Sequence, residues 1–117
     1  MITKPKWRRC LNYKRRQPMS KKVYISGPIS GYDLAERKEA FASAANRFRR
    51  QGYYVVNPME IQLPKDASWS DYMRADIRAL MDCDIIYMLS GWHTSRGATI
   101  ERNLAEELGM KVMLERQ

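Results

Sequence analysis

Four short apolar runs, separated by segments with helical spacing, limit the fold of this chain more than any other feature. The runs cover residues 22–26, 53–56, 84–90 and 111–114 and are rich in the β-branched and aromatic side chains typical of strands. Helices are expected between them, at residues 34–50, at about 68–81 and from the mid-90s to residue 108. No hairpin turn joins two runs. Strands that alternate with helices predict a parallel sheet with both faces covered.

Connection rules narrow the topology further. Crossovers between parallel strands are right-handed, which favours an α/β, flavodoxin-like or Rossmann-like three-layer sandwich with about four parallel strands in the order 2-1-3-4. In the last helix, we expect Ile100, Leu104 and Leu108 to face the core, Glu101 to lie in the first turn and Gly109 to end the helix. In the first helix, Arg37 is expected to lie largely off the buried face.

The basic charge of the chain is concentrated at its N-terminus. The formal net charge is +8, and residues 1–20 hold seven Lys or Arg and no acid. Residues 21–117 are nearly neutral, which predicts a basic extension (1–20) and one domain (21–117). The stretch from Lys4 to Arg16, with two aromatic residues, could bind nucleic acid, but a solvated arm is the favoured interpretation.

Other classes of protein are disfavoured by what the sequence lacks. No apolar segment matches a signal peptide or a transmembrane helix, so a cytoplasmic location without membrane contact is expected. The two cysteines, Cys10 and Cys83, have no motif spacing, and Cys83 is expected to fill the core. His93 is the sole histidine and no paired cysteines accompany it, so a metal site is not predicted. An organic cofactor is not predicted either.

Candidate functional residues lie where the predicted strands end, because parallel sheets bind ligands outside the carboxyl ends of their strands. Several have structural alternatives. Glu101 could serve the helix dipole, Tyr24 could fill the core, and Asp76 could be a boundary residue. Trp92 could stack on a base or cover an apolar edge. The guanidinium of Arg96 could bind a phosphate group bidentately. The predicted ligand-binding residues are Ser26, Gly27, Pro28, Ile29, Ser30, Gly31, Asn57, Trp92, Ser95, Arg96 and Gly97.

Taken together, three motifs resemble the nucleoside 2-deoxyribosyltransferase superfamily, which includes the 2′-deoxynucleoside 5′-monophosphate N-hydrolases. They are the YISGPISG stretch from Tyr24 to Gly31, Asp76 eight residues before Asp84, and a pattern at the last helix, SxGxxxExxxA. The resemblance covers residues 21–114. The sequence around Asn57-Pro58, Trp69, Tyr72-Met73 and Gly91-Trp92 is more similar to a small phage- and prophage-associated branch of largely unknown function.

This resemblance implies cleavage or transfer at the N-glycosidic bond of a (deoxy)nucleoside or its 5′-monophosphate. It implies that Glu101 is the nucleophile, that Tyr24 orients its carboxylate, and that Asp76 contacts the substrate and protonates the leaving base. Ser30, Ser95 and the loop after the first strand would contact the 5′ group. A homodimer or higher homo-oligomer is implied as well, because relatives share pocket residues between subunits.

Two other classes of function stay open from the sequence. One is a nucleotide-binding or sensing module without turnover. The other is a nucleic-acid-binding protein that acts through the basic N-terminal arm.

Overall fold

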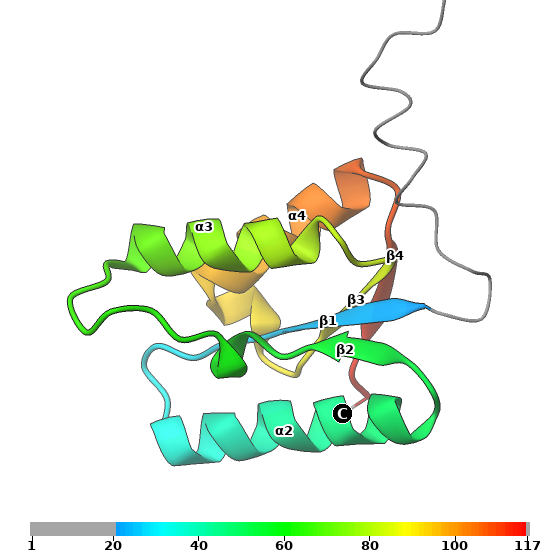
Figure 1. Ribbon diagram of the computed structural model, residues 1–117, viewed down its shortest axis with the longest axis horizontal. Helices are drawn as coiled ribbons and strands as arrows, with labels where there is room; N and C mark the ends of the chain where they lie inside the picture. The colour runs from blue at the N-terminus through cyan, green and yellow to red at the C-terminus, as the bar shows by residue number, and fades with distance from the viewer. Residues whose placement is uncertain (1–20, 117) are drawn as a thin grey trace, which may run out of the picture.

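A four-stranded sheet lies between helix α2 on one face and helices α3 and α4 on the other (Figure 1). The computed structural model describes residues 21–116, so expectations about the basic extension lie outside the described residues. The elements in chain order, with η for a short 3₁₀ helix, are β1 (Lys22–Ser26), α2 (Leu34–Arg50), β2 (Tyr54–Val56), η1 (Pro58–Glu60), α3 (Trp69–Leu80), β3 (Ile85–Met88), η2 (Trp92–Thr94), α4 (Arg96–Glu107) and β4 (Lys111–Leu114).

The sheet has the strand order β2-β1-β3-β4, and all three strand pairs are parallel. The predicted three-layer α/β fold and its strand order are therefore confirmed. The central strands end level with one another, because Ser26 of β1 pairs with Met88 of β3. The loops that follow β1 and β3 thus leave the sheet side by side.

Alternation along the central strands divides the core into two halves, because successive strand residues point to opposite faces. One half packs against α2 and is formed mainly by Val23, Ile25, Phe41, Ala44, Ala45, Phe48, Ile85, Tyr87 and Leu89. The other packs against α3 and α4 and is formed mainly by Tyr24, Leu80, Cys83, Ile86, Met88, Ala98 and Ala105. Tyr24 and Ser26 therefore belong to the face of β1 that meets α4.

Helix α3 begins as the sequence predicts. The Asp71 amide donates to Ser68 Oγ (3.1 Å), and the Ser68 amide donates to the Asp71 carboxylate (2.9 Å), which together form a capping box. The inward face of the helix carries Met73 and Leu80, with Asp76 partly buried between them. Within residues 21–116, none of the helices has both the length and the apolar character to cross a membrane.

Helix α4 differs from the prediction in two ways. It begins at Arg96 with Ser95 as its N-cap, so Glu101 lies in the second turn rather than the first. Its buried face carries Ala98, Glu101 and Ala105, whereas Ile100 and Leu108 are exposed. The reason is close packing against α3, because a Cβ on Gly97 would lie only 3.1 Å from Met73 Sδ. Large side chains do not fit at such an approach and turn outward.

Arg37 also differs from the prediction. It is 8% exposed and belongs to the buried side of α2, although the sequence pattern placed it off that face. Its guanidinium donates hydrogen bonds to Glu36 and to the Pro28 carbonyl. Each of its three nitrogens therefore has a hydrogen-bond partner although the side chain is buried. The other buried residues of this helix are apolar: Phe41, Ala44, Ala45 and Phe48.

Candidate active site

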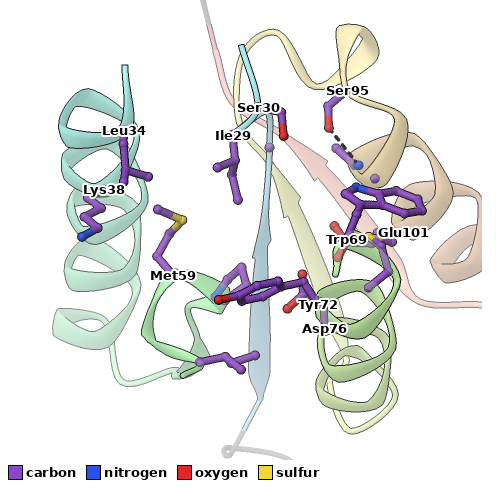
Figure 2. Close-up of a pocket in the computed structure, with 16 residues that line it drawn as sticks. Ile29, Ser30, Leu34, Lys38, Met59, Trp69, Tyr72, Asp76, Ser95 and Glu101 are labelled. Atoms are coloured by element: carbon purple, nitrogen blue, oxygen red, sulfur yellow. Dashed lines mark hydrogen bonds between the residues drawn. The ribbon is translucent and has the colours of Figure 1, made fainter. Parts of the chain in front are cut away.

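A cavity of about 420 Å³ lies at the carboxyl ends of the strands, between α2 and α3. Figure 2 shows Leu34 and Lys38 on one side of it and Trp69, Tyr72 and Asp76 of α3 on the other. Its lining residues are Gly27, Ile29, Ser30, Leu34, Lys38, Pro58, Met59, Ile61, Trp69, Tyr72, Met73, Asp76, Ser95, Gly97, Ala98 and Glu101. Three loops and three helices thus contribute to one pocket, at the edge where the sequence predicts a ligand site.

Glu101 is the buried acid of this pocket, with 5% of its surface exposed. Tyr24 Oη donates to its Oε2 (2.6 Å), and Ser26 Oγ donates to its Oε1 (2.7 Å). Both donors come from the same face of β1, two residues apart, and so meet the two carboxylate oxygens from the sheet. Neither Tyr24 nor Ser26 lines the cavity itself, so they hold the carboxylate from behind.

Burial and hydrogen bonding have opposite effects on the pKa of Glu101. Burial raises its pKa to about 7, and the nearby Asp76 charge adds to the rise, while the Ser26 and Tyr24 hydroxyls oppose it. Tyr24 is affected in turn. Burial, followed by the charge of Glu101, raises the pKa of its phenol well above the ordinary value. The phenol therefore stays protonated and remains a hydrogen-bond donor.

Asp76 is the second carboxyl of the pocket. Burial raises its pKa to about 6. Its Oδ1 is buried and has no hydrogen-bond partner in the described part of the chain. A buried acceptor without a partner carries a free-energy cost that a ligand donor would relieve. Asp76 is therefore placed to accept a hydrogen bond from a molecule in the cavity or, when protonated, to donate one.

The loop after β1 approaches the end of β3 closely. A Cβ on Gly27 would lie 2.8 Å from Leu89 Cβ, so only glycine fits there without displacement. This brings Ile29 and Ser30 into the pocket lining. Pro28 is buried behind the loop, and Gly31 is exposed in a turn with φ +83°, so these two predicted binding residues do not face the cavity.

On the other side, Ser95 both lines the pocket and accepts a hydrogen bond from the Ala98 amide (3.2 Å), which caps α4. Gly97 lines the pocket next to it. Predicted residues that line the cavity are thus Asp76, Glu101, Gly27, Ile29, Ser30, Ser95 and Gly97.

Three predicted binding residues have other contacts. Asn57 is 5% exposed, and its side chain accepts from the Met59 amide (3.0 Å) to cap η1. Trp92 packs on the half of the core that contains Tyr24, and the Arg102 guanidinium lies 5.1 Å from its ring centroid. Arg96 stacks on Trp69 at 4.4 Å. None of the three lines the cavity, although Trp69, on which Arg96 stacks, does.

Several lining residues were not predicted as ligand contacts. Leu34 and Lys38 come from α2, Ile61 follows η1, and Trp69 and Tyr72 come from the first turn of α3. The cluster of aromatic and sulfur-containing side chains at residues 69–73 was the available signal in the sequence. Lys38 is the one cation among the residues that line the cavity.

The described residues do not hold a group of three or more His, Cys, Asp or Glu side chains arranged to bind a metal ion. Two of the side chains that line the pocket, Asp76 and Glu101, carry carboxyl groups that can take part in chemistry. A carboxylate held by two hydroxyls can act as a nucleophile or stabilise a cation, and a second carboxyl of raised pKa can donate a proton near neutral pH.

The fold and pocket define a three-layer α/β protein with a buried glutamate and a partly buried aspartate at the carboxyl edge of its sheet. Residues 21–114 match a family model described as a domain of unknown function, DUF4406. The protein belongs to this family. A comparison with curated proteins gave no significant match.

Proposed function

We propose that this protein cleaves the N-glycosidic bond of a (deoxy)nucleoside or its 5′-monophosphate through a glutamate nucleophile. The observation that carries the proposal is the buried Glu101 carboxylate, held by Tyr24 (2.6 Å) and Ser26 (2.7 Å) in a cavity that also contains Asp76. This arrangement fits the roles that the resemblance implies for Glu101, Tyr24 and Asp76. It also supplies the two carboxyl groups that glycoside chemistry needs.

In the first step, a carboxylate oxygen of Glu101 attacks C1′ of the sugar. The C1′–N bond breaks, and its electron pair passes to the base nitrogen, which takes the proton of Asp76. Positive charge develops on the sugar in the transition state, where the negative carboxylate stabilises it. The free base leaves, and the sugar stays bound to Glu101 as an ester.

In the second step, a water oxygen attacks C1′, the ester bond to Glu101 breaks, and Asp76 takes a proton from the water. The products are the free sugar or sugar phosphate and the regenerated carboxylate. If a nitrogen of a second base replaces water, the same sequence transfers the sugar instead. Hydrolase and transferase activities therefore share one intermediate.

The protonation states set a condition on this mechanism. Glu101 must be ionised, yet its pKa is about 7, and Asp76 must be protonated, yet its pKa is about 6. Because the carboxyl with the higher pKa must be the ionised one, this combination is a minority state between the two pKa values. The proposed reaction therefore has a narrow pH optimum.

Incubation with a panel of deoxyribo- and ribonucleosides and their 5′-monophosphates tests the proposal by release of free base. Glu101→Gln should lower release at least about a hundredfold, because it keeps the shape and removes the charge. Glu107→Gln changes an exposed glutamate of the same helix and serves as the matched control. Acid quenching followed by peptide mass spectrometry should detect the sugar ester on Glu101. Base release by Glu101→Gln at the wild-type rate would refute the assignment.

A second candidate function is nucleotide binding without turnover. It is favoured by the burial of Glu101 and by the engagement of both its oxygens with hydroxyl donors. Calorimetric titration with the same panel distinguishes the two functions. Binding of a nucleotide with no base released in a single-turnover assay would support the binding module and exclude the enzyme.

We also propose a cytoplasmic homodimer or higher homo-oligomer, with a second copy of this chain covering exposed apolar side chains. Trp69 and Tyr72 at the pocket rim are 43% and 40% exposed, and Leu108 on α4 is 55% exposed. Light scattering at assay concentration tests the assembly, and a monomer would exclude it.

The nucleic-acid alternative rests on the basic arm, and a chain starting at Met19 should retain base release if the arm plays no part in the chemistry.

A further inference from the structure

Arg37 is a buried arginine close to the candidate active site but outside its lining. It lies at the end of the first turn of α2, between the lining residues Leu34 and Lys38. Its side chain is 10% exposed. Arginine is rarely buried to this degree without a full set of partners, so its contacts indicate what it holds in place.

The guanidinium of Arg37 makes hydrogen bonds on two sides. Nε and Nη2 donate to the two carboxylate oxygens of Glu36, both at 2.8 Å. Nη1 donates to the carbonyl oxygen of Pro28 (3.3 Å), in the loop after β1. Because Glu36 neutralises the charge, Arg37 acts on this loop through hydrogen-bond geometry rather than through its electric field.

Tyr32 extends this contact to the loop after β3. The Arg37 guanidinium lies 5.2 Å from the centroid of the Tyr32 ring. Tyr32 Oη lies 3.3 Å from Thr94 Oγ1, which donates to the Gly91 carbonyl (2.7 Å). A Cβ on Gly91 would lie 3.4 Å from Tyr32 Oη and 3.5 Å from Pro28 Cγ, so the two loops are packed together here.

We propose that Arg37 is a positioning residue that fixes the two loops of the pocket rim relative to each other through Pro28, Tyr32 and Thr94. The loop after β1 carries Ser30, and the loop after β3 leads to Ser95; both serines line the same end of the pocket (Figure 2). The spacing of these hydroxyls is what a polar group of a ligand would recognise. The role of this spacing in substrate binding rests on the proposed function, whereas the loop geometry does not.

Arg37→Met and Arg47→Met form a matched pair for testing this role. Both arginines lie on α2, and Arg47 also donates a hydrogen bond, to Tyr87 Oη (2.7 Å), and stacks on the Tyr87 ring at 5.5 Å. Arg47 contacts neither loop nor cavity lining in these interactions. Each substitution keeps a long side chain and removes the guanidinium donors, so the two variants differ in which segment loses its anchor.

Hydrogen–deuterium exchange measures the loops without requiring turnover. Arg37→Met should speed exchange about tenfold in peptides covering residues 27–33 and 90–95, because a hydrogen bond from a charged donor is lost, while β1 and β3 keep their protection. Arg47→Met should leave both loops unchanged. Unchanged exchange in the Arg37→Met loops, or an equal rise throughout the sheet in both variants, would overturn the proposal.

Kinetics then connect the loops to the proposed function. On a verified substrate, Arg37→Met should raise KM about tenfold and leave kcat within about twofold, and Arg37→Lys should recover part of the loss because it keeps one donor. Equal effects of Arg37→Met and Arg47→Met on KM would contradict a positioning role. If the wild-type protein releases no base from any nucleotide, the proposed function fails, while the exchange data still decide the role of Arg37.

Discussion

Replacing Glu101 with glutamine should change how the stability of the protein depends on pH. The ordinary pKa of a glutamate is 4.5, and burial in the folded protein raises that of Glu101 to about 7. The folded state therefore holds a proton that the unfolded state releases between these values. Its contribution to stability is complete below pH 4.5 and is lost as the pH rises through 7.

The size of this effect follows from the two pKa values. Each pKa unit corresponds to about 1.36 kcal/mol, so ionising Glu101 in the folded state costs up to about 3 kcal/mol. The wild-type protein should lose that much stability between pH 4.5 and 8 beyond what the Glu101→Gln variant loses. Comparing the two pH values within each protein cancels the constant effect of altered hydrogen bonds to Tyr24 and Ser26.

Urea unfolding, followed by tryptophan fluorescence at both pH values, measures this difference. Asp76 contributes in the same direction, since its pKa is also raised, and it remains in both proteins. Glu107→Gln, an exposed position on the same helix, should keep the wild-type dependence on pH. If wild-type and Glu101→Gln proteins lose equal stability between pH 4.5 and 8, the pKa of Glu101 is not raised, and the argument from its burial is wrong.

Three further predictions concern the same pocket. The pH profile of kcat/KM on a verified substrate should be bell-shaped, with apparent pKa values near 6 and 7. Asp76→Asn should remove the fall in kcat/KM at high pH, and a fall that persists in this variant would exclude Asp76 as the acid. Tyr24→Phe removes a hydrogen bond that lowers the pKa of Glu101. Because the carboxyl with the higher pKa must be the ionised one, the high-pH limb of kcat/KM should move to higher pH and the maximum should fall, and an unmoved high-pH limb would argue against that coupling. Gly27→Ala should cost about 2 kcal/mol in urea unfolding, because its Cβ would overlap Leu89 Cβ; an unchanged midpoint would show that the loop can move aside.

The fold was predictable from the sequence because buried parallel strands read as continuous apolar runs. β3 has four buried residues in succession, Ile85–Met88, as expected for a strand covered on both faces. The contact between Tyr24 and Glu101 is different, because these residues are 77 positions apart. No local pattern pairs them, and the prediction of their proximity came from the resemblance to a known superfamily.

What the sequence could not indicate depends on neighbours that are distant along the chain. The spacing of Ile100, Leu104 and Leu108 suggested a buried stripe, but close packing of Met73 on Gly97 turns the small face of α4 inward. Arg37 looked like a surface residue because its burial depends on a carbonyl nine positions away. Side-chain patterns give the period of an element, whereas the packing partner decides which of its faces is buried.

The carboxylate and the two hydroxyls that hold it have a consequence for sequence variation within this family. A chain that kept an acid at position 101 but had apolar residues at positions 24 and 26 would bury a carboxyl group without donors. A chain that lost the acid would leave two buried hydroxyls without their acceptor. Substitutions at Tyr24, Ser26 and Glu101 are therefore expected to occur together during the evolution of the family. These three positions should distinguish members that keep the pocket acid from members that lack it.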